Sequence, residues 1–221
     1  MNTESLARIS GIILAGGKSR RMGQDKALLE LDGKPILQHV LDRIAPLCAE
    51  IILVANDAPA YGQFGVKIIS DVLPGKGSLG GLYSGLLAAR HDYGFAVACD
   101  MPFVNPALVR YLISLAPPND VVIPRAHDPS SRAKRAPRAD RPMAKENDLH
   151  PMHAIYSKQC LPIIAERLRA DDLRLIGFLP DVRTRIVEQD EIDRFDPKHL
   201  SFFNTNTPDD FRFAQALAQE P

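Results

Sequence analysis

Apolar and polar positions follow two alternating patterns along this chain. Apolar runs of four or five residues are typical of buried β-strands, and they fall at Gly11–Ala15, Ile51–Ala55, Val66–Ile69, Phe95–Cys99 and Val121–Pro124. The longer stretches between them repeat apolar residues every three or four positions, which predicts helices. One such set is Ile36, Leu37, Val40, Leu41 and Ile44, and another is Leu79, Leu82, Leu86 and Leu87. Strands that alternate with helices predict an α/β fold, a three-layer α/β/α sandwich with a mostly parallel, Rossmann-like central sheet.

Two more helix starts and one irregular stretch complete the pattern. Proline in the first turn after a capping residue predicts helices that begin at Asn105-Pro106 and at Thr207-Pro208. The stretch Arg125–Asn147 is rich in Arg, Lys, Ala, Pro and Asp and has almost no aliphatic side chains. Because such a composition cannot build a core, we expect a flexible insert over 125–149, within a single domain that spans residues 1–221.

Charge and apolar content narrow the class of protein. The 27 Lys and Arg residues equal the 27 Asp and Glu residues in number, so no overall field favours nucleic acid or an anionic membrane. The basic run Arg132–Arg141 has no aromatic partner and is better interpreted as a solvated insert than as a nucleic-acid site. The apolar run Gly11–Gly17 is too short for a signal peptide or a membrane span. We therefore expect a cytoplasmic monomer with neither nucleic acid nor membrane as a partner.

The loop after the first apolar run carries the clearest chemical signal. Gly16 and Gly17 end the run, and Arg20, Arg21 and Lys26 follow. Small residues let backbone N–H groups approach phosphate oxygens, and basic side chains offset the charge of the anion. The spacing fits neither a Walker A loop nor a G-x-G-x-x-G fingerprint. The loop therefore predicts a triphosphate site of another kind.

This loop resembles the L-A-G-G-x-S-x-R-M-G-x-D-K loop of the molybdenum cofactor guanylyltransferases, which are nucleotidyltransferases that activate small molecules with nucleoside triphosphates. Four further segments agree in the same order and extend the resemblance over nearly the whole chain: Gly77–Leu82, Ala98–Phe103, His150–Tyr156 and Phe203–Asp209. The resemblance implies that the protein uses Mg²⁺ and GTP. It would add GMP to the terminal phosphate of molybdopterin and release pyrophosphate.

Such a reaction requires few protein groups. A phosphate oxygen of the acceptor attacks the α-phosphorus and pyrophosphate leaves in line, so catalysis rests on positioning and electrostatics. The resemblance implies that Lys26 contacts the triphosphate, and Arg21 would assist it, although Arg20 could serve instead. Asp100 follows an apolar run and is the candidate Mg²⁺ ligand, since one carboxylate can suffice alongside phosphate oxygens and water. The alternative for Asp100 is the capping of a turn.

Residues near the ends of the predicted strands are the candidates for nucleotide binding. Besides Lys26 and Asp100, they are the backbone of Leu14, Ala15, Gly16 and Gly17, the side chains of Asn56 and Asp71, and Gly80. The resemblance implies that the Asn and the Asp serve the guanosine, and a carboxylate that accepts from guanine would favour GTP over ATP. Gly80 and Gly81 would let a helix N-terminus approach the nucleotide. Asn56 and Asp71 could equally be ordinary turn residues.

The resemblance assigns the segment Asn204-Thr205-Asn206 to the acceptor. Asn204 and Asn206 would point to the same face if the segment is extended, but a capping role for Asn206 or Thr207 competes with this assignment. His150 and His153 are three residues apart, yet Pro151 argues against a helix that would pair them as metal ligands.

Two other functions remain open from the sequence. A cytidylyltransferase that acts on molybdopterin or another small phosphorylated acceptor is the closest, although such relatives typically carry Leu-Ala-Ala-Gly in place of Leu14–Gly17. A catalytically silent nucleotide-binding module would have little reason to keep both Lys26 and Asp100. Molybdoenzymes, their chaperones or other cofactor-biosynthesis proteins are the macromolecular partners that the resemblance implies.

Overall fold

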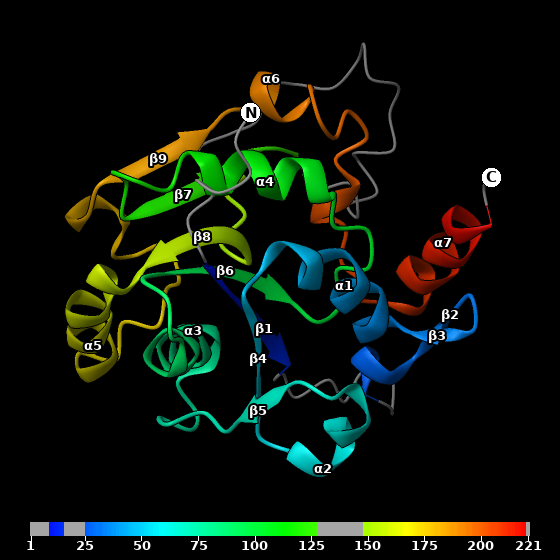
Figure 1. Cartoon of the computed structure of the whole chain (residues 1–221), viewed down its shortest axis with the longest axis horizontal. Helices are drawn as coiled ribbons and strands as arrows, with labels where there is room; N and C mark the ends of the chain where they lie inside the picture. The colour runs from blue at the N-terminus through cyan, green and yellow to red at the C-terminus, as the bar shows by residue number, and fades with distance from the viewer. Residues whose placement is uncertain (1–8, 16–24, 128–147, 220–221) are drawn as a thin grey trace.

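A seven-stranded sheet forms the centre of the molecule (Figure 1). The computed structural model describes residues 9–15, 25–127 and 148–219. The strands lie in the order β5-β4-β1-β6-β8-β7-β9. Their bounds are β1 Ile9–Ala15, β4 Glu50–Ala55, β5 Lys67–Ile69, β6 Tyr93–Ala98, β7 Val121–Pro124, β8 His153–Ser157 and β9 Thr184–Val187. β8 runs antiparallel to both of its neighbours and the other neighbouring pairs are parallel, which confirms the mostly parallel sheet.

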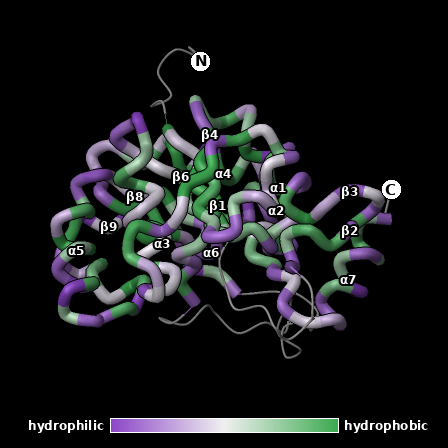
Figure 2. The backbone as a smooth tube through the Cα atoms, turned by 90° about the horizontal axis from the view of Figure 1, so that it is seen from below, coloured by the Kyte–Doolittle hydropathy of each residue, from purple (hydrophilic) through white to green (hydrophobic). Residues whose placement is uncertain are grey.

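Helices cover both faces of this sheet, so the predicted three layers are confirmed (Figure 1). One face packs against α1 (Ile36–Ile44) and α4 (Pro106–Ser114). The other packs against α3 (Gly77–Ala88) and α5 (Leu161–Arg169). Every residue of β1 is buried, and its side chains alternate between the two layers, Ile13 in one and Ile12 in the other. The central strands β1 and β6 are hydrophobic and surrounded by more polar segments (Figure 2).

The shorter elements lie at the periphery. A small hairpin of β2 (Glu30–Leu31) and β3 (Lys34–Pro35) turns at Asp32-Gly33, both with positive φ, which is the geometry of the tight Asp-Gly turn. The C-terminal α7 (Pro208–Ala218) packs against it through a small cluster that includes Leu31 and Ala214. The remaining short helices are α2 (Ala58–Tyr61) and α6 (Gln189–Ile192). The 3₁₀ turns are η2 (Lys26–Leu28), η3 (Ala45–Leu47), η4 (Gly62–Phe64), η7 (Lys158–Cys160), η8 (Leu179–Asp181) and η9 (Leu200–Phe202).

Capping explains where the two proline-led helices begin. The Asn105 side chain accepts from the Ala107 and Leu108 N–H groups at 2.8 and 3.3 Å, which caps α4. Thr207 and Asp210 form a reciprocal capping box at the start of α7. The cap of α7 is therefore Thr207 and not Asn206, and the acceptor role of Asn206 stays a prediction. In α3 one expectation is wrong: Leu87 belongs to the predicted apolar stripe, but it is 51% exposed.

Both ends of the predicted insert are part of the folded domain. Arg125 forms an isolated antiparallel bridge with Leu149, and the Ala126 N–H donates to the Asp148 carbonyl at 3.1 Å. Ala126 is fully buried in the core, so the chain leaves the sheet later than position 125 and returns before position 149. Residues 128–147, which include the basic run Arg132–Arg141, lie outside the described residues.

Candidate active site

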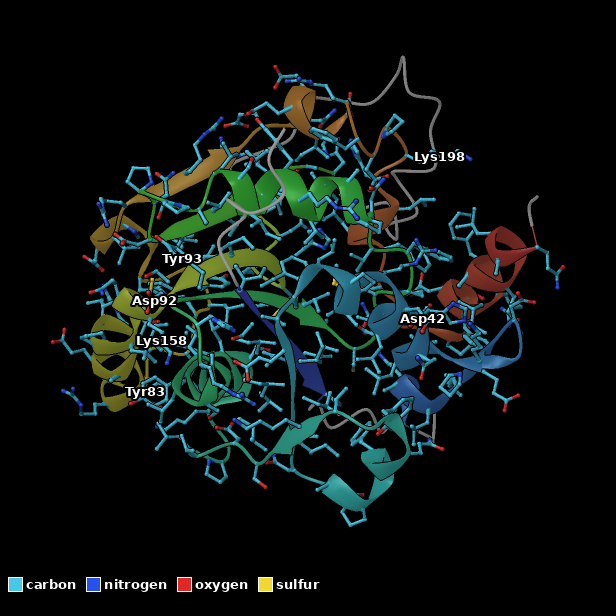
Figure 3. The ribbon with its side chains drawn as sticks, in the orientation of Figure 1. Asp42, Tyr83, Asp92, Tyr93, Lys158 and Lys198 are labelled. Atoms are coloured by element: carbon cyan, nitrogen blue, oxygen red, sulfur yellow. The ribbon has the colours of Figure 1, made fainter. Side chains whose placement is uncertain are left out.

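The carboxyl ends of four parallel strands bring several of the predicted site residues to one edge of the sheet, which we call the rim. The register pairs Ala15 with Ala55, Leu14 with Ala98 and Val54 with Ile69, so β1, β4, β5 and β6 end at similar heights. Ligands of such sheets bind beyond these carboxyl ends. The opposite edge, where Tyr93 begins β6 and the Lys158 N–H donates to the Asp92 carbonyl at 2.8 Å, carries structural contacts (Figure 3).

The described residues include only part of the predicted phosphate loop. Leu14 and Ala15 form the end of β1, and the Leu14 carbonyl accepts from the Cys99 N–H at 3.2 Å. Gly16, Gly17, Arg20 and Arg21 lie outside the described residues. The contacts expected of them therefore stay predictions.

Lys26 lies at the start of η2, and its side chain contacts the C-terminal part of the chain. Its Nζ donates to Asn206 Oδ1 at 3.0 Å, although 180 positions separate the two residues. The contact joins the candidate triphosphate lysine to the candidate acceptor segment. It also leaves the ammonium two further N–H donors that a phosphate could accept.

Asp100 is held against the same segment by its backbone. The Asp100 carbonyl accepts from the Thr205 N–H at 3.0 Å and lies 3.2 Å from Thr205 Oγ1. Thr205 is fully buried, and it is a contact that the sequence analysis did not single out. Asn204, by contrast, donates its amide to the Phe202 carbonyl at 3.0 Å. Thr205 therefore fixes Asn204 and Asn206 beside the end of β6.

Burial and the neighbouring Lys26 act in opposite directions on the pKa of the Asp100 carboxyl group. Burial raises its pKa above the ordinary value, and the nearby positive charge of Lys26 offsets part of that effect. Such a carboxylate gains from an additional cation, and carboxylate oxygens are ligands that Mg²⁺ prefers. The described residues contain no group of three or more His, Cys, Asp or Glu side chains that could hold a metal on their own. The donor set thus suits a Mg²⁺ ion that arrives with phosphate oxygens and water.

A second group of polar contacts follows β4 and β5. The Asn56 Oδ1 accepts from the Asp71 N–H at 3.2 Å, which brings the two predicted guanosine residues together. The Asp71 Oδ1 accepts from the Leu73 N–H at 3.0 Å and lies 2.7 Å from Ser84 Oγ. Ser84 comes from α3, is 1% exposed, and also accepts from the Val72 N–H at 3.0 Å. Ser84, which no sequence motif marks, holds the Asp71 carboxylate in place.

Gly80 lets α3 pack closely against this group. A Cβ at Gly80 would lie 3.0 Å from Asp71 Oδ2, and one at Gly81 would lie 3.4 Å from the Leu14 side chain. Close approach to Asp71 explains Gly80, whereas a Cβ at Gly81 would make an ordinary van der Waals contact. Contact of Gly80 with a nucleotide stays a prediction.

His150 and His153 both contact Phe202, but with different ring geometries. The His150 ring stacks on Phe202 with centroids 4.0 Å apart, and its Nε2 lies 2.7 Å from the Ala126 carbonyl oxygen. His153 is fully buried, and burial lowers its pKa to about 3. Its ring meets the edges of Phe95 and Phe202 at centroid distances of 5.1 Å. His153 is therefore a neutral core residue.

Comparison with known proteins identifies the class of this enzyme, which is a nucleotidyltransferase. A model of the family described as "MobA-like NTP transferase domain" matches residues 11–181. That match covers more than half of the chain, and the chain therefore belongs to the MobA-like NTP transferase family. The family predicted from the sequence motifs is confirmed.

Relatives that are named molybdenum cofactor guanylyltransferase align over most of the chain. A probable molybdenum cofactor guanylyltransferase of Pelotomaculum thermopropionicum is 33% identical over 97% of this chain and 95% of its own length. The molybdenum cofactor guanylyltransferase of Syntrophotalea carbinolica is 34% identical over 91% of this chain and 88% of its own length.

Solved structures share the fold. The molybdopterin-guanine dinucleotide biosynthesis protein A of Archaeoglobus fulgidus superposes with a TM-score of 0.74 at 23% identity, covering 95% of this chain and 98% of its own. A cytidylyltransferase of Thermus thermophilus superposes with a TM-score of 0.65 at 20% identity, covering 96% and 100% of the two chains. At these identities the likeness shows the fold alone. Among the residues that the structure describes, no helix is both long and apolar enough to cross a membrane.

Proposed function

We propose that this protein is a molybdenum cofactor guanylyltransferase, which transfers GMP from GTP to the terminal phosphate of molybdopterin. The relatives that align over most of the chain carry this activity name. The contact between Lys26 and Asn206 is the observation that best supports the proposal. It joins a residue of the predicted triphosphate loop to a residue of the predicted acceptor segment, so two phosphorylated substrates would bind side by side there.

The reaction forms one bond and breaks one bond at the α-phosphorus. A terminal phosphate oxygen of molybdopterin forms the new P–O bond, and the bond to the β-phosphate oxygen breaks, so pyrophosphate leaves with its electron pair. Lys26 would offset the charge that develops on the phosphates, as a fixed cation stabilises a transition state. Arg21, Gly16 and Gly17 would add donors from the phosphate loop.

Asp100 is the proposed Mg²⁺ ligand. The bound Mg²⁺ would neutralise charge on the phosphate oxygens and the leaving group. The carboxylate of Asp100 would hold it beside the ammonium of Lys26, and the backbone of Asp100 is itself held by Thr205.

Asn56 and Asp71 are the proposed guanosine-reading residues. Guanine presents an N1–H and an exocyclic amino group, and both are donors that a carboxylate can accept. Adenine presents an acceptor at N1, so a carboxylate there would leave two acceptors facing each other. The fixed orientation of Asp71 by Ser84 would make this discrimination stronger. Asn204 and Asn206 would bind molybdopterin, and molybdoenzymes or their chaperones would receive the product.

The first test is pyrophosphate release with Mg²⁺ and molybdenum-loaded molybdopterin, with GTP, CTP, ATP and UTP offered separately. Asp100→Ala is the loss-of-function variant. Asp42→Ala is the matched control, since Asp42 is an exposed carboxylate on α1 that pairs with Lys34 at 3.0 Å (Figure 3). We expect turnover with GTP alone, its loss in Asp100→Ala, and normal turnover in Asp42→Ala.

Other outcomes would redirect the proposal. Turnover with CTP would keep the chemistry and overturn the assignment of the base. Tight binding of GTP without turnover of any nucleotide would favour a silent nucleotide-binding module or another acceptor.

A further inference from the structure

A buried tyrosine, Tyr61, contacts the loop that carries Lys26. Tyr61 is the last residue of α2, the short helix that follows Asn56 at the end of β4. It is 4% exposed and belongs to the main core cluster. Its hydroxyl donates a hydrogen bond to Asp25 Oδ2. A buried hydroxyl that is aimed at a single carboxylate of another loop points to a positioning role.

Asp25 connects Tyr61 to the turn that begins with Lys26. Its second oxygen, Oδ1, accepts from the Ala27 N–H at 3.1 Å, so Asp25 is the N-cap of η2. The Asp25 carbonyl also accepts from the Leu28 N–H at 3.1 Å. Ala27 is fully buried, so the turn is fixed on its inner side. Both carboxylate oxygens of Asp25 are therefore engaged, one with the turn and one with Tyr61.

The hydroxyl stays a donor across the physiological range. Burial raises the pKa of Tyr61 far above its ordinary value, and the hydrogen bond to Asp25 raises it further. Tyr61 is therefore neutral at any pH at which the enzyme works. The hydrogen bond to the Asp25 carboxylate is charge-assisted, which is the stronger kind.

We propose that Tyr61 is a positioning residue for Lys26, whose backbone turn it holds in place through Asp25. This inference rests on the proposed role of Lys26 at the triphosphate. Asn206 holds the ammonium group of Lys26, and the Tyr61–Asp25 pair would hold the Lys26 backbone. Catalytic groups lose much of their effect when they are displaced by a fraction of an ångström. Tyr61 also lies five residues after Asn56, which follows β4, so it links the nucleoside side of the site to the phosphate side.

The test is the variant Tyr61→Phe, which removes the hydroxyl and keeps the ring in the core. We expect kcat for pyrophosphate release to fall about tenfold, with a small change in KM for GTP. Tyr111→Phe is the matched control, because the Tyr111 hydroxyl also donates to a carboxylate, Glu191 Oε1, at 2.6 Å. That pair joins α4 to α6, away from α2 (Figure 1). We expect Tyr111→Phe to keep the wild-type kcat.

A double-variant cycle separates positioning from a general loss of structure. Tyr61→Phe should cause no further loss of kcat in a Lys26→Ala background, because the group through which it acts is gone. Asp25→Ala provides a second background, in which Tyr61→Phe should again cause no further loss of kcat. This variant should retain more activity than Lys26→Ala. A full tenfold loss in either background would overturn the inference, as would a wild-type kcat in Tyr61→Phe alone. Wild-type activity in Lys26→Ala would overturn the role of Lys26 and with it this inference.

Discussion

Lys26 Nζ and Asn206 Oδ1 lie 3.0 Å apart, so the predicted triphosphate loop and the predicted acceptor segment meet in one hydrogen bond. Lys26→Ala should lower kcat at least about 100-fold, the usual cost of removing a group that stabilises transition-state charge. Asn206→Ala should lower kcat about tenfold and also weaken acceptor binding. Steady-state kinetics with GTP and molybdopterin varied in turn would measure both effects.

Asn204→Ala is the comparison for that experiment. The Asn204 amide contacts the Phe202 carbonyl and not Lys26, so this variant should change only the KM for molybdopterin. Equal losses of kcat in Asn204→Ala and Asn206→Ala would show that the lysine contact carries no catalytic effect.

Ser84 offers a test of base selection through a residue that contacts Asp71 and is not itself proposed to contact the nucleotide. Ser84→Ala deletes the hydroxyl that lies 2.7 Å from Asp71 Oδ1, and the carboxylate should then turn more freely. We expect the KM for GTP to rise about fivefold, and the preference for GTP over ATP to fall, with kcat little changed. Ser10→Ala is a suitable control because Ser10 is equally buried but donates to Glu50, at the opposite end of β1. An unchanged nucleotide preference in Ser84→Ala would contradict the role of Asp71.

The Asp100 carboxylate should lower the free energy of unfolding of the protein. Its pKa is raised in the native state, so the native state binds protons more readily than the unfolded chain. Between the unfolded and folded pKa values, stability therefore falls as pH rises. Asp100→Asn should remove this slope and stabilise the protein by about 1 kcal/mol while abolishing turnover. Urea unfolding across a pH series would show it, and a destabilised Asp100→Asn protein would refute it.

For His153 we expect the opposite dependence of folding stability on pH. Its pKa is lowered to about 3 by burial, whereas an unfolded histidine titrates near 6.5. The unfolded chain therefore takes up the proton first, and stability should fall as pH drops below about 6.5, by several kcal/mol on reaching pH 3. His153→Phe keeps an aromatic ring against Phe95 and Phe202 and should show a shallower loss. The measurement is again the free energy of unfolding, and parallel curves for the two proteins would count against a neutral buried imidazole.

The sequence was most informative where the side-chain pattern is periodic. The apolar stripe of Ile36–Ile44 matches the bounds of α1. Strand β8 was missed because its sequence, His-Ala-Ile-Tyr-Ser, begins and ends with polar residues even though all five are buried. Strand β9 was missed because only Val187 of its four residues is fully buried. Burial at these positions is decided by neighbours that are distant in sequence.

The same limit applied to the site. Strand ends placed Asn56, Asp71 and Asp100 on one rim without knowledge of the structure, because parallel strands share their direction. The groups that hold those residues, Ser84 and Thr205, have no local signature. They are identified only once a helix and a C-terminal loop have packed against the sheet, since their partners lie 13 and 105 positions away in the chain.

The attachment of Thr205 to the backbone of Asp100 also means that the C-terminal segment completes the candidate site. Domains tend to fold from the N-terminus as the ribosome releases them, and β1, β4, β5 and β6 all precede position 100. The partner of Asp100, and that of Lys26, emerge only with the last tenth of the chain. A polypeptide that ends before Thr205 would thus lack the contacts that hold Asp100 and Lys26 at the rim.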